Sequence, residues 1–107
     1  MKKKDFYIVT KGDTDPCVVL RHGYEDDKCF YNQSRSDPDF WIATDKSTGL
    51  RIAIRKSRKE LIDLIHSDSV DRSIKENIAL NPKRYQDLCD AYRSAIHDKE
   101  HKYIIPN

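Results

Sequence analysis

Two histidines near the end of the sequence have the spacing of a metal-binding helix. His97 and His101 stand four residues apart in a segment that matches the pattern H-x-x-E-H. On a helix such residues share one face, so both imidazoles could hold one ion. A zinc hydrolase also needs a third protein ligand, and no acid, histidine or cysteine follows His101. We therefore interpret the segment as a solvated helix end, with adventitious metal binding and a metal-dependent hydrolase as the alternatives.

Other side chains capable of catalysis lack a recognisable arrangement. The three cysteines, Cys17, Cys29 and Cys89, have no C-x-x-C spacing, and we expect buried free thiols. The three glycines are scattered, so no phosphate-cradling loop is predicted. A two-metal nuclease built from scattered acids is the remaining enzymatic alternative. We predict a protein that is not an enzyme and that uses no cofactor and no metal.

The composition narrows the class of protein. A chain of 107 residues fits one domain, which we place at residues 1–107. Its residues are 37% hydrophobic and 36% charged, against about 45–50% and about 25% in average domains, so the core should be small. The apolar runs are far shorter than the ~20 residues of a membrane span. No apolar signal region follows the basic start, so we expect the cytoplasm of a bacterial host.

The first half of the sequence predicts strands and the second half predicts helices. Apolar and β-branched runs between turn clusters predict an antiparallel sheet of four to five strands within about residues 5–55. Capping residues and apolar stripes predict two to three helices near residues 57–66, 69–79 and 82–99. We also expect a turn at residues 22–27 and a short strand or packed tail at residues 102–105. Strands followed by helices indicate an α+β fold.

The net charge of +2 results from the cancellation of two charged regions. Residues 11–40 carry seven acids against four bases, a net charge of −3. Residues 41–60 carry six bases against two acids, a net charge of +4. A mosaic of this kind suits a protein partner at least as well as a nucleic acid.

The basic region lies on a predicted hairpin and the helix start after it. Alternation from Leu50 to Arg55 predicts that Arg51 and Arg55 share the face opposite the large aliphatic residues. Basic residues at a helix start oppose the helix dipole and so indicate an anionic partner, with an ordinary solvated face as the alternative. Trp41 either joins the basic residues on an open face or belongs to the core. The candidate contacts are Trp41, Lys46, Arg51, Arg55, Lys56, Arg58 and Lys59.

The stretch from Phe40 to Ile65 carries a resemblance in its pattern. A strand, a glycine-ended turn, a second strand and then Ser-Arg-Lys-Glu-Leu-Ile resemble small α+β proteins of bacteriophages and mobile elements from low-GC Gram-positive bacteria. One group with such units is the arm-type DNA-binding domain of phage integrases. The other is the set of small anti-defence proteins, including anti-CRISPR proteins, that bind and block a host nuclease. The resemblance covers about 26 of the 107 residues.

These observations predict a non-enzymatic binding protein of phage or mobile-element type. The expected mechanism is occlusion of a nuclease or another nucleic-acid-handling protein, by a monomer or homodimer without membrane association. The alternative is direct DNA binding by the hairpin and helix start at residues 40–59. Acidic side chains in the predicted turns could mimic phosphates toward a basic groove of the partner. They are Asp13, Asp15, Glu25, Asp26, Asp27, Asp37 and Asp39.

Overall fold

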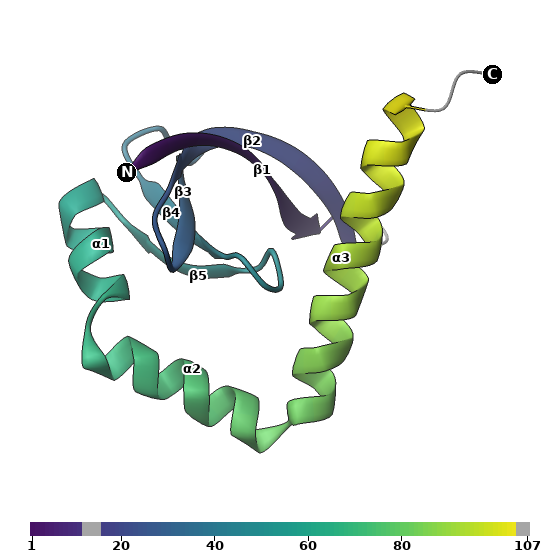
Figure 1. Cartoon of the computed structure of the whole chain (residues 1–107). Helices are drawn as coiled ribbons and strands as arrows, with labels where there is room; N and C mark the ends of the chain where they lie inside the picture. Colours follow the sequence, from purple (N-terminus) through teal and green to yellow (C-terminus); the bar gives the residue numbers. More distant parts are fainter. Residues whose placement is uncertain (12–15, 105–107) are drawn as a thin grey trace.

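The computed structural model describes residues 1–11 and 16–104 and has the predicted α+β architecture. Five strands precede three helices, which lie around the sheet in an open arc (Figure 1). The elements are β1 (Lys2–Lys11), β2 (Pro16–Glu25), β3 (Cys29–Gln33), β4 (Trp41–Asp45), β5 (Arg51–Arg55), α1 (Arg58–Ile65), α2 (Asp68–Leu80) and α3 (Pro82–Ile104). No helix in the described ranges is both long and apolar enough to cross a membrane.

The sheet is an antiparallel meander in which the strands follow one another in chain order from β1 to β5. Its strands extend further than the sequence predicts, because β2 continues through the expected turn at residues 22–27 as far as Glu25. Gly23 makes this extension possible, since a Cβ there would lie 2.0 Å from the carbonyl oxygen of Tyr31 on β3. The turn itself is confined to the residues between Glu25 and Cys29.

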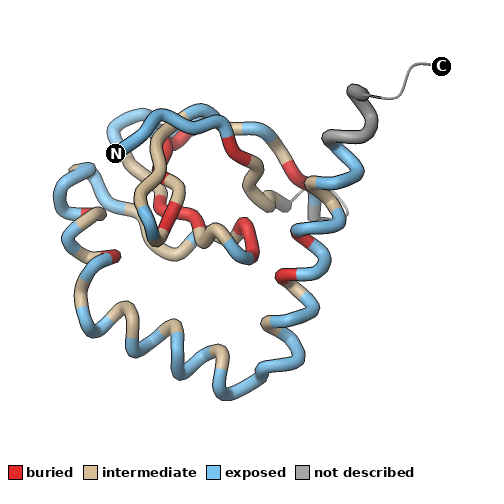
Figure 2. The backbone as a smooth tube through the Cα atoms, viewed as in Figure 1, coloured by how far each residue is buried: buried red, intermediate tan, exposed pale blue. Residues whose placement is uncertain are grey.

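The main core lies between α1 and one face of the sheet. Tyr31 on β3 lies opposite Ala43 on β4, and both are fully buried against Leu61 and Ile65 of α1. Leu61 and Ile65 are four residues apart, so they lie on the same face of the helix. Figure 2 shows buried segments in the strands, in α1 and in α3, whereas α2 has no buried residue.

A second set of contacts joins β1 to the β4–β5 turn and α3. The amide of Val9 donates to the carbonyl of Gly49 at 2.8 Å, and the hydroxyl of Tyr92 on α3 donates to the carbonyl of Tyr7. Gly49 adopts a positive φ of 70°, a conformation that side chains disfavour. The sheet therefore curls until the end of β1 meets the turn before β5 (Figure 1).

The helices begin at the capping residues seen in the sequence. The Ser57 and Ser67 hydroxyls accept hydrogen bonds from the amides of Glu60 and Val70. The side-chain Oδ1 of Asn81 accepts one from the Arg84 backbone amide at 3.1 Å. At its other end, α3 continues through Ile104, beyond the predicted boundary near residue 99, so residues 102–104 are helical and not a strand. Ile105 lies outside the described residues.

Candidate functional site

Strand β5 contains a bulge that changes which way its two arginines face. Arg55 lies opposite Trp41, whereas Arg51 lies opposite Thr44, and the register shifts between them so that Ile52 is the extra residue. Paired residues of an antiparallel ladder share a face, and successive residues of a strand alternate. Because Trp41 and Thr44 are three residues apart on β4, Arg51 and Arg55 lie on opposite faces. The predicted common face for the two arginines is therefore wrong.

The bulge also turns two successive apolar side chains toward α1. Ile52 and Ala53 both pack against the cluster formed by Tyr31, Leu61 and the other fully buried residues. A bulge puts two residues of one strand against one residue of its neighbour. Strand β5 consequently stays anchored to the core although it is an edge strand.

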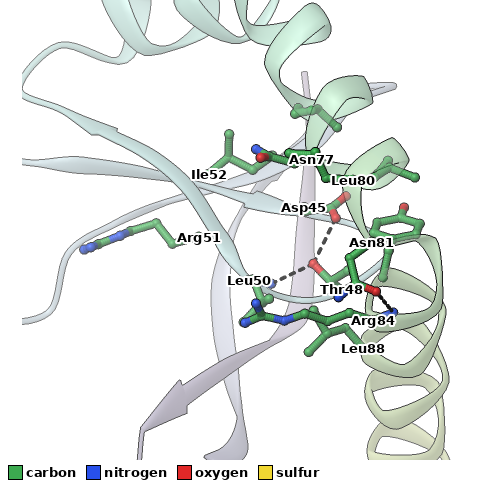
Figure 3. A pocket seen from close by; sticks show the side chains of 13 residues that line it. Asp45, Thr48, Leu50, Arg51, Ile52, Asn77, Leu80, Asn81, Arg84 and Leu88 are labelled. Atoms are coloured by element: carbon green, nitrogen blue, oxygen red, sulfur yellow. Dashed lines mark hydrogen bonds between the residues drawn. The ribbon is translucent and has the colours of Figure 1, made fainter.

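A groove separates the outer edge of β5 from helix α2. One cavity, of about 520 Å³, lies between the β4–β5 turn, α2 and α3 (Figure 3). A second, of about 640 Å³, lies between β5 and the first half of α2. Arg51, Ile52, Ile74 and Asn77 line both cavities, so we treat them as one β5–α2 groove. Each volume falls within the ~300–1,000 Å³ of ordinary ligand sites.

The helical wall of the groove is apolar and only half-buried. Val70, Ile74 and Ile78 recur at a spacing of four along α2, and all three line the groove. Leu80, at the end of the same helix, is 82% exposed. Amphipathic helices are normally stable because their apolar face is packed. Here Val70 packs against the core, whereas Ile74 and Ile78 stay half-buried beside the groove.

Positive charge surrounds the groove. Arg51, Arg55 and Arg84 line it, and Figure 3 shows the Arg84 side chain directed from α3 toward the β4–β5 turn. Asp45 is the carboxylate in this lining, and it accepts hydrogen bonds from the Thr48 hydroxyl at 2.9 Å and from a turn amide at 3.2 Å. Its charge is therefore directed into the turn, so the groove carries an excess of positive charge.

Trp41 is half-buried and covered by an arginine. The Arg58 guanidinium lies 5.5 Å from the ring centroids of both Tyr24 and Trp41, which are 6.2 Å from each other. Trp41 also packs against the core beneath α1. The sequence left open whether Trp41 belongs to the core or lies on an open face. The structure favours a residue at the edge of the core.

Four exposed basic residues lie together where β5 leads into α1, and we call them the α1 basic patch: Arg55, Lys56, Arg58 and Lys59. The Lys56 ammonium lies over the ring of Phe40 at 5.6 Å. In the described part of the chain, no carboxylate forms an ion pair with any of the four. These four residues also lie within five consecutive positions of the sequence, residues 55–59.

Lys46 does not join this patch. It follows β4 at the other end of the hairpin, where its ammonium pairs with Glu25 at 3.1 Å and lies 5.3 Å from the Phe30 ring centroid. The six basic residues at positions 41–60 are therefore divided. Four form the α1 basic patch, Arg51 lines the groove, and Lys46 pairs with Glu25.

The predicted acidic residues are also divided. Glu25 is paired with Lys46, whereas Asp27, Asp37 and Asp39 are exposed. The Asp37 carboxylate accepts a hydrogen bond from the Asp39 amide at 3.2 Å within the β3–β4 loop. Asp13 and Asp15 lie outside the described residues.

The Asp26 carboxylate connects the β2–β3 turn with β3 and with the end of α1. Its carboxylate accepts hydrogen bonds from the amides of Lys28 and Cys29 at 2.8 and 2.9 Å, and from the Tyr31 hydroxyl at 2.7 Å. The His66 Nε2, at the end of α1, lies 2.9 Å from the same carboxylate. Partial burial opposes ionisation, but these hydrogen bonds outweigh it and lower the Asp26 pKa to about 2.

Asp26, Asp27 and His66 bring one ligand atom each within 4.8 Å of one another, the arrangement of a small metal site. The oxygens of Asp26 are already engaged with β3 and α1, as described above. Binding an ion there would replace these contacts, so the cluster is explained by its part in holding the β2–β3 turn to α1.

The cysteines and His97 lie apart from the groove, whereas the side chain of His101 lies outside the described part of the structure. Burial, followed by the charges of Asp26 and Asp45, raises the Cys29 pKa to about 12, and such a thiol is a poor nucleophile at neutral pH. Cys89 is buried too, whereas Cys17 is exposed, so the expectation that all three thiols are buried is wrong for Cys17. His97 is exposed on α3, 4.0 Å from Asp98.

The groove itself was not predicted from the sequence. In the sequence, the apolar stripe of α2 predicts a helix and no binding site, and nothing there distinguishes Asn77 or Arg84. The sequence does contain both walls of the groove, a strand with an arginine at each end and a helix with an apolar stripe. That they face each other becomes visible only when the structure places β5 beside α2. Comparisons of the chain with protein families, with curated proteins and with solved structures each find no match.

Proposed function

We propose that this protein is a protein-binding module that captures an extended segment of a partner in the β5–α2 groove. The observation that carries the proposal is that two facing surfaces, a strand edge and an apolar helix face, leave part of their bonding and packing capacity unused among the described residues. The outer edge of β5 has no neighbouring strand among the described residues, and the apolar face of α2 opposite it contains no buried residue.

These two surfaces offer complementary interactions to one occupant. An extended segment added to β5 makes main-chain hydrogen bonds with the strand edge, as in β-strand addition. Its side chains on the outer side then bury the stripe formed by Val70, Ile74 and Ile78. Val70 packs α2 against the core at its first turn, and Asp71 beside it pairs with Lys28 at 3.0 Å, so this end of the helix is held while Ile74 and Ile78 face the groove.

A second copy of this chain is a poor occupant. The sequence of β5 is Arg-Ile-Ala-Ile-Arg, with an arginine at both ends. Antiparallel pairing of two such strands gathers four arginines, Arg51 and Arg55 of each copy, at one short seam, and like charges concentrated in this way repel one another. The arginines thus protect this edge from self-association while leaving it open to a strand of opposite charge.

The partner class predicted from the sequence is compatible with this mode. Occlusion of a nuclease or another nucleic-acid-handling protein by a small anti-defence protein remains our hypothesis for the identity of the partner. Direct DNA binding by residues 40–59 is the weaker candidate, because the rings of Tyr24 and Trp41 contact Arg58 and each other. A base would have to displace that arginine to stack on them.

The test is selection of a displayed library of random 12-residue peptides against the full chain, followed by affinity measurement on the enriched peptides. Ile74→Glu places a charge in the groove, while Ala79→Glu places the same charge on an exposed position of α2 outside the groove. We expect Ile74→Glu to weaken binding at least ten-fold and Ala79→Glu to leave it unchanged. Circular dichroism checks that both variants fold. Failure to enrich any peptide, or equal affinity for all three proteins, refutes the proposal.

A further inference from the structure

We infer that the α1 basic patch binds a run of carboxylates that continues, in the partner chain, from the segment held in the groove. The inference rests on the proposed function and adds the chemistry of the ligand: a short apolar stretch followed by an acidic stretch. It assigns a binding role to Arg58, Lys56 and Lys59, which lie outside the groove.

The first support is that the patch keeps its charge unneutralised. Lys28, Lys46 and Arg93 pair with acids, at 3.0, 3.1 and 3.5 Å, whereas the other described lysines and arginines form no ion pair. The patch differs from these by bringing four such residues to one place. The four members of the patch have no acidic partner among the described residues, although the protein contains 18 acidic residues. Four like charges at one place create a local positive potential that attracts an anionic ligand.

The second support is the fixed position of Arg58. Its guanidinium lies 5.5 Å from the centroids of two rings, Tyr24 and Trp41, and Trp41 is itself held against the core. Cation–π contacts with two rings restrict the Arg58 side chain, and no described residue accepts a hydrogen bond from its guanidinium. A carboxylate matches the edge of a guanidinium with two parallel hydrogen bonds, and little side-chain entropy is lost on binding.

The third support is continuity between the groove and the patch. Arg55 lines the groove and is also the first residue of the patch. Only Lys56 and Ser57 separate it from Arg58 at the start of α1. Arg58 then reaches inward over Trp41 of β4 and Tyr24 of β2. A segment that passes Arg55 therefore turns from the edge of β5 across the end of the sheet to meet the patch.

A nucleic acid is the competing ligand for a basic patch, and the surroundings favour a polypeptide. The rings that would stack with bases are covered by Arg58. The groove beside the patch combines its arginines with an apolar wall, which a polypeptide with apolar side chains can bury and a phosphate backbone cannot. Nucleic-acid binding is accordingly made one outcome of the test.

The experiment uses peptides enriched by the selection above, each synthesised with its acidic residues intact and with Asp and Glu replaced by Asn and Gln. Affinities are measured by fluorescence anisotropy for the wild type, Arg58→Gln, Arg58→Lys and the control Arg72→Gln. Arg72 is exposed on α2 and lines neither groove cavity, so the control removes the same charge elsewhere. A 20-nucleotide single-stranded DNA is titrated in parallel.

We expect the enriched peptides to carry acids on one side of an apolar stretch. Arg58→Gln should weaken the acidic form roughly ten-fold, the scale of one hydrogen-bonded charge contact. It should also reduce the salt dependence of binding and leave the neutral form unaffected. Arg58→Lys should give an intermediate loss, since it keeps the charge without the planar fork.

Three results overturn the inference while leaving the groove proposal intact. They are enriched peptides without acids, an equal effect of Arg58→Gln on both peptide forms, and an effect of Arg72→Gln as large as that of Arg58→Gln. Tight DNA binding that is lost in Arg58→Gln also overturns it, because the patch is then a nucleic-acid site. If no peptide depends on Ile74, both the proposed function and the inference fail.

Discussion

Replacing Asp26 by Asn should remove a pH-dependent part of the stability. The Asp26 carboxylate has an ordinary pKa of 3.8 and a pKa of about 2 in the folded protein. At 1.36 kcal/mol per pKa unit, this difference corresponds to roughly 2 kcal/mol of stabilisation when the group is ionised. The asparagine side chain keeps one acceptor oxygen, so it cannot replace both oxygens that serve the turn amides, Tyr31 and His66.

The sign of the pH dependence follows from the direction of the shift. Between pH 4 and pH 2 the unfolded chain binds more protons at Asp26 than the folded chain does, so acid favours unfolding. The contribution is fully present above about pH 4 and is lost as the pH falls toward 2. Asp26→Asn should therefore be about 2 kcal/mol less stable than the wild type at pH 7, with the gap closing toward pH 2.

The assay is urea unfolding followed by circular dichroism at a series of pH values, with Asp27→Asn as the matched control. Asp27 is the exposed neighbour, and its loss should change the free energy of unfolding by less than about 0.5 kcal/mol. A gap between wild type and Asp26→Asn that stays constant from pH 7 to pH 2 would refute the role given to the carboxylate charge.

Two further perturbations test other parts of the fold. Gly49→Ala puts a Cβ 2.3 Å from the Tyr92 ring at a φ of 70°, and thermal unfolding should show a loss of about 2–3 kcal/mol. Tyr92→Phe removes only the hydroxyl and should cost about 1 kcal/mol; equal losses for the two would argue against strain at Gly49. Because Cys17 is the exposed thiol and the other two are buried, a thiol reagent should modify one cysteine rapidly in the native protein and all three in denaturant, as mass spectrometry can count.

Local chemistry made the helices predictable from the sequence. Ser57, Ser67 and Asn81 bond to amides three residues further on, so each cap depends only on its own turn of chain. A sheet of four to five strands could be predicted for a similar reason, because turn-forming residues separate short apolar runs.

The departures come from contacts between distant residues. The bulge at Ile52 interrupts an alternation that looks regular in the sequence, because packing Ile52 and Ala53 together against the core requires it. Gly23 resembles a turn residue in the sequence, but it serves a close approach to Tyr31 on the neighbouring strand. Neither effect can be read from a window of a few residues.

The candidate site was half predictable for the same reason. The patch of Arg55, Lys56, Arg58 and Lys59 is contiguous in the chain, so composition was enough to find it. The groove needs β5 and α2 to face each other, and the stripe on α2 has the same spacing whether it packs in a core or remains available.

The bond from Tyr92 to Tyr7 has a consequence for how the chain folds. It joins residues 85 positions apart, whereas each strand of the meander pairs with the next strand in the chain. Contacts of low sequence separation close small loops and form early, whereas those of high separation carry the larger loop entropy and form late. The meander and α1 should therefore assemble first, with β1 and α3 locking together in the last step. On a ribosome, the protein would expose its finished β5 edge before the helix that completes the groove had been synthesised.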